Sequence, residues 1–306
     1  MVPSHAVIAG VNKAGTTSLF ASLSTHPAVA PASIKETRYF LPARYGKPLE
    51  PISVYDAYFA DAAPGAVRLE ATPSYLYGGA AVARAIDDAL PDPRILVILR
   101  EPVNRTISFF RYQKVRLRFP AELTITEYLA EADRLSQAEF GDPDNEKFMA
   151  VRGSCYAEFV PAWLEQFGPE RVRFLFFEDM TRDALPELHG VASWLGIDPA
   201  GIDRGGLSSE NRTTGYKSSA LQRVALTGND RFEAFLRRHM GLKRRMRARY
   251  YRLNGQKAQD NVADDVRDAL ADRFSAPNAM LAAQLSPLGV VLPDWLAPAT
   301  PSQASA

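Results

Sequence analysis

The sequence predicts an α/β fold: a central parallel β-sheet flanked by helices, with a phosphate-binding strand-loop-helix unit near its start. Short apolar runs of strand length alternate with helical patterns through the first two-thirds of the chain. A glycine-containing turn joins the first such run to the first helical pattern. Because parallel strands need crossover connections, this alternation indicates a parallel sheet with helices on both faces.

The expected elements follow one another along the chain. Leu19, Phe20 and Leu23 lie on one side of the first helix, and Pro102 opens a later one because proline suits the first helical turn. The expected strands are His5–Gly10, Val67–Ala71, Arg94–Leu99 and Arg171–Phe177, and the expected helices are Thr16–Ser24, 80–90, the helix after Pro102 and one around 159–167. The C-terminal third is expected to be mostly helical.

The length and composition indicate one folded domain. The chain has 306 residues, of which 46% are hydrophobic and 23% charged, as in ordinary globular proteins. It contains no internal repeat and no long linker, so we expect a single domain over residues 1–296. Residues 297–306 have the composition of a flexible tail.

Several classes of protein are excluded by composition. Cys155 is the sole cysteine, so the chain cannot form an internal disulfide or a CxxC metal pair. The four histidines lack metal-ligand spacing, and we expect no bound metal. The aliphatic run at 95–99 is far shorter than the ~20 residues of a transmembrane helix, and no signal sequence opens the chain. We therefore expect a cytoplasmic protein.

The charge is unevenly distributed. The sequence has 36 Lys and Arg against 35 Asp and Glu, a formal net charge of +1, yet residues 237–252 contain eight basic residues and no acidic one. Such runs are usually solvated faces. Nucleic acid, membrane headgroups and an acidic acceptor remain alternative partners for this basic block, although no recognised nucleic-acid motif accompanies it.

The loop between the first strand and the first helix is a candidate anion site. A strand-to-helix turn directs backbone N–H groups and the positive helix end at one point, and Thr16, Thr17 and Ser18 add hydroxyl donors. The glycine spacing matches the nucleoside triphosphatase pattern GxxxxGK[ST], but Thr16 stands where that pattern has lysine. The lysine lies earlier, at Lys13. An ordinary tight turn is the alternative interpretation.

The strand that ends at Leu99 leads into a second candidate site. A magnesium-dependent phosphoryl transferase usually has an aspartate at such a strand end, whereas this chain has Arg100. Arg100 and Ser108 could hold a phosphate, the arginine through its planar fork and the serine through its hydroxyl. Glu178 and Asp179 could imitate a metal-binding strand end, but Asp179 also suits the cap of a helix starting near Thr181.

Six segments resemble the sulfotransferases that use 3′-phosphoadenosine 5′-phosphosulfate (PAPS), especially the glycan-type branch that includes heparan sulfate sulfotransferases. GVNKAGTTSL resembles their 5′-phosphosulfate loop, and ILREPVNRTISFF resembles their 3′-phosphate motif R-x-P-x-x-R-x-x-S. KETRYF and EATPSYLY are similar to the glycan-type segments K-E-x-x-[FY]-F and E-K-T-P-x-Y-F. The segment from RGSCYAEF to FFED and the closing helix DDVRDALADRFSAPNAMLAAQL also agree.

The resemblance implies roles for particular residues. Lys13 would neutralise the leaving phosphate oxygen, and Arg100 with Ser108 would bind the 3′-phosphate. Glu36 would be the general base that takes the acceptor proton, with Lys35 orienting it or contacting the sulfate. The donor-binding residues implied in this way are Lys13, Ala14, Gly15, Thr16, Thr17, Ser18, Arg100 and Ser108, with Gly255 and Lys257 in a loop that closes over PAPS.

The acceptor is less well defined. Ala71 replaces the lysine of E-K-T-P-x-Y-F, which counts against an acidic polysaccharide and leaves Glu70 as a second carboxylate of structural or catalytic use. The aromatic residues Tyr39, Phe40, Tyr75 and Tyr77 could line an acceptor wall or belong to the core. Asn211 resembles a family asparagine without an assigned role. A sugar, glycolipid or secondary-metabolite hydroxyl is the expected acceptor.

Two other functions are weighed against sulfuryl transfer. A nucleotide kinase or triphosphatase would need magnesium, and the displaced lysine and Arg100 count against it. A nucleic-acid-binding protein would use the basic block, but we expect no nucleic acid because the overall charge is near zero.

Overall fold

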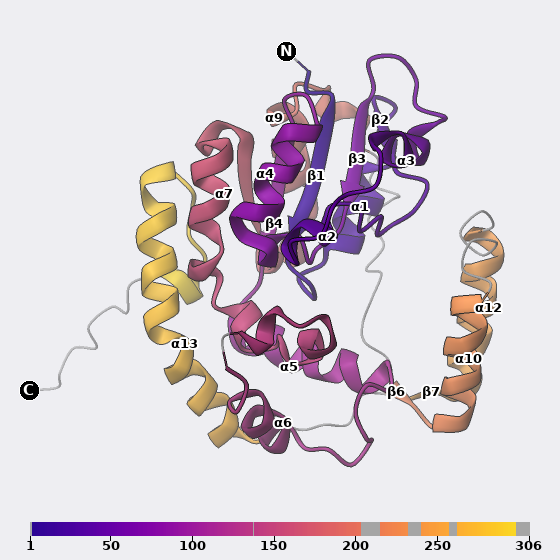
Figure 1. Ribbon diagram of the computed structural model, residues 1–306, viewed down its shortest axis with the longest axis vertical. Helices are drawn as coiled ribbons and strands as arrows, with labels where there is room; N and C mark the ends of the chain where they lie inside the picture. The colour runs from indigo at the N-terminus through magenta and orange to yellow at the C-terminus, as the bar shows by residue number, and fades with distance from the viewer. Residues whose placement is uncertain (1, 137, 203–214, 232–239, 257–261, 298–306) are drawn as a thin grey trace, which may run out of the picture.

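The centre of the molecule is a parallel five-stranded sheet, seen in the computed structural model of Figure 1, which describes residues 2–136, 138–202, 215–231, 240–256 and 262–297. Its strand order is β2-β3-β1-β4-β5, and every neighbouring pair is parallel. The strands are β1 His5–Gly10, β2 Val29–Pro31, β3 Val67–Ala71, β4 Arg94–Leu99 and β5 Val172–Phe176. This confirms the predicted fold class.

Two layers of helices cover the sheet. α4 (Gly79–Ala89) packs against α7 (Val160–Phe167) on the face that is toward the viewer in Figure 1. α1 (Thr16–Leu23) contacts α9 (Ala184–Trp194) on the opposite face. α13 (Asp264–Leu285) lies outside α7 and reaches α5 (Pro102–Val115). The shorter helices are α2 Leu41–Arg44, α3 Ile52–Asp56, α6 Ile125–Ala132 and α8 Phe177–Arg182.

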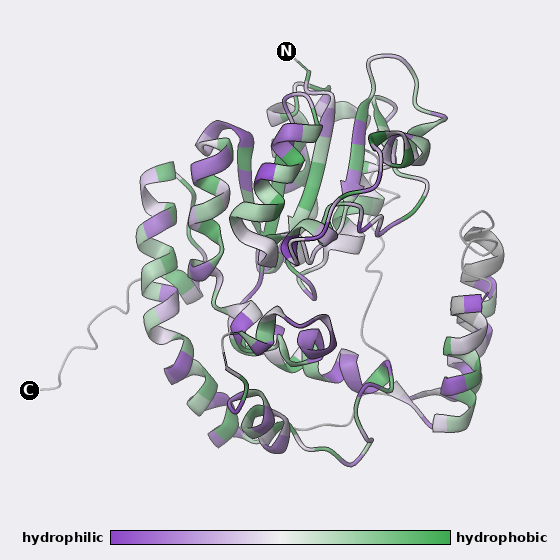
Figure 2. Ribbon diagram, in the orientation of Figure 1, coloured by the Kyte–Doolittle hydropathy of each residue, from purple (hydrophilic) through white to green (hydrophobic). Residues whose placement is uncertain are grey.

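The core forms where the apolar runs meet these helices. Each of the five residues from Ile95 to Leu99 is fully buried, because a central parallel strand is covered on both faces. Figure 2 shows the same pattern as hydrophobic colour along the strands and on the inward sides of the helices. Burial of this apolar surface is the main driving force for the fold.

One helix start differs from the prediction. The helix expected near Thr181 with Asp179 as its cap begins earlier: α8 starts at Phe177, so Asp179 lies inside its first turn. Asp179 pairs with Arg182 at 2.9 Å. The N-cap of the next helix is Asp183, whose carboxylate accepts from the N–H of Leu185 at 3.3 Å.

A pair of helices stands to one side of the sheet. α10 (Ser219–Arg231) and α12 (Met240–Asn254) lie together, joined at their base by the antiparallel strands β6 (Gly215–Tyr216) and β7 (Gly255–Gln256). The amide of Gln222 donates to the carbonyl of Val115 at the end of α5, 2.6 Å away. Within the described ranges, no helix has the length and hydropathy needed to cross a bilayer.

Candidate functional site

The loop after β1 lies at the carboxyl end of the sheet, the edge where parallel α/β folds bind ligands. Gly15 precedes α1 and has φ +86°, in the left-handed region that favours glycine. A β-carbon there would lie 2.9 Å from Cδ2 of Phe177, which is too close. Glycine is therefore required at this position by both backbone conformation and packing.

The N-terminus of α1 suits an anion. Gly15 provides no side-chain cap, and the first turn contains no acidic residue. The first N–H groups of a helix lack intrahelical acceptors and form the positive end of its dipole. Thr16, Thr17 and Ser18 occupy this turn, with Thr16 buried. Ala14, also buried, precedes Gly15 in the loop.

Lys13 is held in an unusual conformation at this loop. Its φ is +73°, which costs a residue other than glycine roughly 1–2 kcal/mol. Its Nζ lies 4.6 Å from the centre of the Tyr112 ring on α5, a cation–π distance. Non-glycine residues in this region of backbone space cluster at functional sites, where the surrounding fold holds them.

Arg100, directly after β4, fixes the same loop. Its Nη1 donates to the carbonyl oxygen of Lys13 at 2.9 Å, and its guanidinium lies 4.4 Å from the centre of the Phe177 ring. Burial lowers the pKa of Arg100, with the neighbouring Glu178 acting in the opposite direction. Its Nε is buried without a hydrogen-bond partner in the described part of the chain. The structure thus places Arg100 against the loop that precedes α1, the candidate anion site. Ser108 lies half-buried further along α5.

Arg105 has a structural role that the sequence reasoning missed. It is 0% exposed and makes five hydrogen bonds, all to oxygens of neutral groups. Its partners are the carbonyls of Asn12 (3.1 Å), Met149 (3.3 Å) and Ala150 (2.7 Å), Ser154 Oγ (2.9 Å) and the Tyr77 hydroxyl (2.8 Å). The signal was present, since Arg105 is the second arginine of R-x-P-x-x-R-x-x-S.

Glu36 lies in the irregular segment between β2 and α2. Its carboxylate is 3.7 Å from the ammonium of Lys35 and 3.7 Å from Nε of Arg38. Burial lowers the pKa of Lys35, while the charge of Glu36 acts to raise it. The ammonium of Lys35 therefore lies beside the carboxylate of Glu36.

Tyr112 on α5 is a neighbour of Lys13 that the sequence did not single out. Burial raises the pKa of the Tyr112 phenol, Arg116 lowers it, and the charge of Glu36 raises it. Lys13 lies over the ring of the same residue. Tyr112 thus contacts Lys13 and also senses the charge of Glu36.

The other aromatic candidates belong to the core. Tyr39, Phe40, Tyr75 and Tyr77 are all at most 7% exposed, so they do not form an acceptor wall. Glu70 is 0% exposed, which gives it a structural position in the interior. Ala71, which replaces the family lysine, is also fully buried.

The C-terminal candidates lie apart from the loop. Gly255 begins β7 and pairs with Tyr216, and a β-carbon on it would lie 2.2 Å from the carbonyl oxygen of Tyr251. Lys257 and Asn211 lie outside the described residues, as do 237–239 of the basic block. The rest of that block is in α12, where Arg245, Arg249 and Arg252 are exposed.

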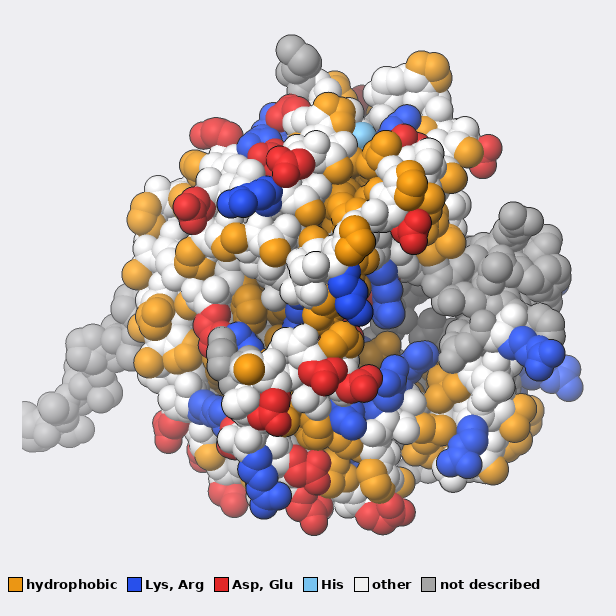
Figure 3. Space-filling model, viewed as in Figure 1, with side chains coloured by type: hydrophobic (Ala, Val, Ile, Leu, Met, Phe, Trp, Pro, Cys, Tyr) orange, Lys and Arg blue, Asp and Glu red, His pale blue; other side chains and the backbone are white. Residues whose placement is uncertain are grey.

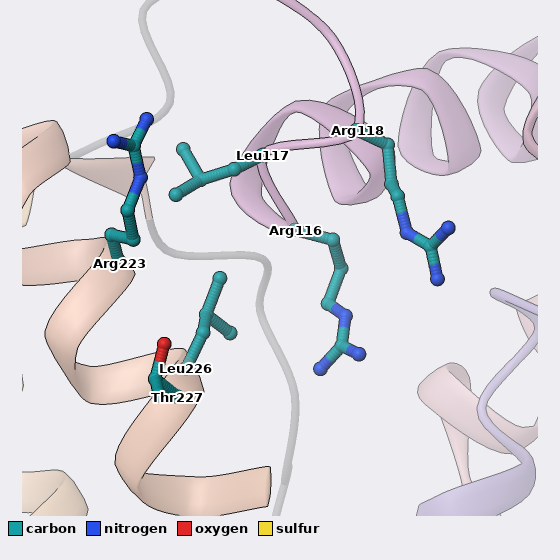
Figure 4. A pocket seen from close by; sticks show the side chains of 6 residues that line it. All are labelled: Arg116, Leu117, Arg118, Arg223, Leu226 and Thr227. Carbon is teal, nitrogen blue, oxygen red and sulfur yellow. The ribbon is translucent and has the colours of Figure 1, made fainter.

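A cavity of about 340 Å³ opens between the end of α5 and α10 (Figure 4). Figure 4 shows Arg116 and Arg118 extending from the end of α5, and Arg223 projecting from α10. Its lining residues are Arg116, Leu117, Arg118, Arg223, Leu226 and Thr227. In Figure 3, Lys and Arg side chains gather around the hollow in the centre of the face that is shown. The cavity is cationic, and its lining includes no acidic side chain.

The carboxylates considered for a metal have other partners. Glu178 accepts from the N–H of Glu101 at 3.0 Å and from the indole of Trp295 at 3.3 Å. Asp179 pairs with Arg182. Among the residues that the structure describes, no group of three or more His, Cys, Asp or Glu side chains could hold a metal ion.

Known proteins resemble this chain in sequence and fold. It is 29% identical over 205 residues to heparan sulfate glucosamine 3-O-sulfotransferase 5 of Homo sapiens, covering 63% of this chain and 54% of the relative. It is 26% identical over 263 residues to heparan sulfate glucosamine 3-O-sulfotransferase 6 of Homo sapiens, covering 82% of this chain and 72% of the relative. The chain spans about half the length of several of the curated relatives it matches.

A solved structure extends the likeness to almost the whole chain. The crystal structure of a sulfotransferase from Alicyclobacillus acidocaldarius superposes with a TM-score of 0.65 at 20% identity, covering 96% of this chain and 98% of that one. At this identity the match establishes the fold. The family model for the sulfotransferase domain matches residues 3–214 of this chain. The predicted resemblance is confirmed: this chain belongs to the sulfotransferase domain family.

Proposed function

We propose that the protein transfers the sulfuryl group of PAPS to an acceptor hydroxyl, with Glu36 as general base and Lys13 stabilising the leaving phosphate. One observation carries the proposal: the loop residue Lys13 lies just before the uncapped N-terminus of α1, and Arg100 donates to its carbonyl oxygen at 2.9 Å. A cation beside a helix N-terminus can stabilise a leaving phosphate, and Glu36 is the carboxylate proposed for proton removal. In this proposal residues 1–296 form one catalytic domain.

The donor-binding groups fit a doubly phosphorylated nucleotide. The uncapped N-terminus of α1 suits the 5′-phosphosulfate, which Lys13, Ala14, Gly15, Thr16, Thr17 and Ser18 would hold. Arg100 has a buried Nε without a described partner, so its guanidinium retains a donor for the 3′-phosphate, with Ser108 as the second ligand. Gly255 and Lys257 are proposed to close over the donor. No metal is assigned to this chemistry.

The proposed reaction is an in-line displacement. Glu36 accepts the proton of the acceptor hydroxyl as that oxygen forms a bond to sulfur. The bond between sulfur and the bridging oxygen of the 5′-phosphate breaks, and its electron pair stays on the phosphate. Lys13 neutralises the resulting charge together with the positive end of α1. The products are the sulfated acceptor and 3′-phosphoadenosine 5′-phosphate.

The cationic cavity supports an acceptor that carries an anionic group. Arg116, Arg118 and Arg223 line it, and Arg116 follows one helical turn after Tyr112, whose ring contacts Lys13. Arginine forks match carboxylates and sulfates. The names of the matched relatives, which act on heparan sulfate glucosamine, agree with a glycan acceptor. The loss of the family lysine at Ala71 is then offset by arginines on another element.

Binding and transfer experiments test this function. In isothermal titration without magnesium, we expect 3′-phosphoadenosine 5′-phosphate to bind far more tightly than ADP. A preference for Mg-ATP would instead favour the kinase alternative. Incubation with radiolabelled PAPS and fractionated glycans should then label an acidic sugar acceptor. We also expect labelling to be lost at about 0.5 M salt, because salt screens the attraction between the cavity arginines and an anionic acceptor.

The basic helix α12 supports a second, peripheral contact. Its sequence from Met240 to Asn254 contains six basic residues and no acidic one, and Met246 and Leu253 are exposed. We infer that this surface contacts an anionic membrane headgroup region. Cosedimentation with vesicles containing about 30% phosphatidylserine should exceed that with neutral vesicles. Equal cosedimentation with both would contradict the inference.

A further inference from the structure

A buried carboxylate lies beneath the segment that carries Glu36. Glu70, the fourth residue of β3, is 0% exposed. Its Oε1 accepts hydrogen bonds from three hydroxyls, those of Thr37, Thr72 (2.9 Å) and Tyr75 (2.7 Å). Three donors converging on one oxygen make a strong, directional anchor in a low-dielectric interior.

The same three hydroxyls hold three consecutive backbone N–H groups next to Glu36. Oε1 accepts in both states, as a carboxylate oxygen or as the carbonyl oxygen of the protonated acid, so each hydroxyl points its hydrogen at Glu70 and offers its lone pairs to the backbone. The N–H donors and their acceptors are Arg38 to Thr72 Oγ1 (3.2 Å), Tyr39 to Thr37 Oγ1 (3.3 Å) and Phe40 to the Tyr75 hydroxyl (3.1 Å). The carboxyl group thereby sets the direction of all three bonds.

The segment has few other constraints. Residues 36–38 are in neither a helix nor a strand, so their backbone depends on side-chain partners. The contacts of Glu36 with Lys35 and Arg38 are 3.7 Å long, beyond hydrogen-bond distance. These ion pairs cannot fix the carboxylate by themselves.

We propose that Glu70 is a positioning residue, which places the Glu36 carboxylate through the hydroxyls of Thr37, Thr72 and Tyr75. Glu70 itself is fully buried and cannot reach an acceptor, whereas the side chain of Glu36 is 28% exposed. The inference rests on the proposed role of Glu36. Burial raises the pKa of Glu70, and the hydrogen bonds from Thr37, Tyr75 and Thr72 oppose that rise.

The first test is amide hydrogen exchange, which needs no enzymatic activity. Tyr75→Phe removes one relay hydroxyl with little change in volume. Tyr128→Phe is the matched control, because Tyr128 is also 0% exposed and its hydroxyl donates to the carbonyl of Lys147 at 3.0 Å instead of to Glu70. We expect exchange at Phe40 to become about tenfold faster in Tyr75→Phe and to stay unchanged in the control. Unchanged exchange in Tyr75→Phe would overturn the inference.

The second test is a double-mutant cycle with Glu36→Gln. Tyr75→Phe alone should lower kcat about tenfold, while the affinity for 3′-phosphoadenosine 5′-phosphate stays within about twofold. In the Glu36→Gln background, Tyr75→Phe should lower kcat no further, because the positioned group is already gone. A full tenfold loss in both backgrounds would mean a general structural effect and would refute the positioning role. Normal turnover of Glu36→Gln would remove Glu36 as base, while the exchange experiment would still decide the relay.

Discussion

Arg105→Lys is expected to destabilise the protein strongly although it keeps the charge. The arginine makes five hydrogen bonds, whereas a lysine has three donors on one nitrogen, so at least two bonds are lost. Buried hydrogen bonds to a charged group contribute about 1.5–3 kcal/mol each. The free energy of unfolding should therefore fall by roughly 3–6 kcal/mol.

Urea unfolding followed by tryptophan fluorescence measures this change. Arg116→Lys is the control, because Arg116 lies half-buried at the rim of the cavity and the same substitution there should change stability by less than about 0.5 kcal/mol. Donor affinity should also weaken in Arg105→Lys, since the bond to the Asn12 carbonyl supports the loop at Lys13. A loss of stability below about 1 kcal/mol in Arg105→Lys would show that the five bonds do not act as inferred.

The remaining predictions concern the transfer site and acid stability. Glu36→Gln should lower kcat by roughly 10²–10⁴-fold in a PAPS transfer assay, with nucleotide affinity near wild type; normal turnover would exclude Glu36 as base. Lys13→Ala should lower both donor affinity and rate, and an unchanged rate at saturating donor would contradict its leaving-group role. Gly15→Ala should weaken nucleotide binding at least tenfold in calorimetry, because the new methyl meets Phe177 and φ is +86°; wild-type affinity would argue against the loop as the phosphate site. Burial lowers the pKa of His5 to about 4, so the folded state takes up its proton later than the unfolded state as pH falls. The contribution of His5 to the free energy of unfolding is present above pH 6.5 and is lost toward pH 4, with about 2 kcal/mol lost by pH 5. Urea unfolding midpoints of His5→Gln should lack this part of the pH dependence.

Local sequence signals were sufficient to predict the central strands, but not the edge strand β2 or the short strands β6 and β7. β1, β3 and β4 match the predicted ranges because each is a continuous apolar run bounded by turn residues. β2 was missed because it has only three residues and ends in proline, which edge strands tolerate. β6 and β7 have two residues each, too short to show any periodicity.

The candidate site was predictable only where a motif marks it. Lys13, Arg100 and Glu36 lie in segments with recognisable patterns, and the structure brings Lys13 and Arg100 into contact through the loop carbonyl. The roles of Tyr112 and Arg105 depend on contacts between distant segments, such as the 93-residue separation between Arg105 and Asn12. Such contacts follow from the packing of α5 against the loop, which no local pattern encodes.

The neutral surroundings of Arg105 imply that nucleotide binding and acceptor binding respond differently to ionic strength. Its partners in the described structure are carbonyl and hydroxyl oxygens, so its positive charge has no counter-charge that would cancel its field at the nearby loop. Mobile ions cannot enter the core to screen a fully buried charge, whereas exposed arginines are screened within about 8 Å at physiological salt. Part of the electrostatic attraction for the nucleotide should thus persist in concentrated salt, whereas the arginine-lined cavity should lose most of its attraction for an anionic acceptor.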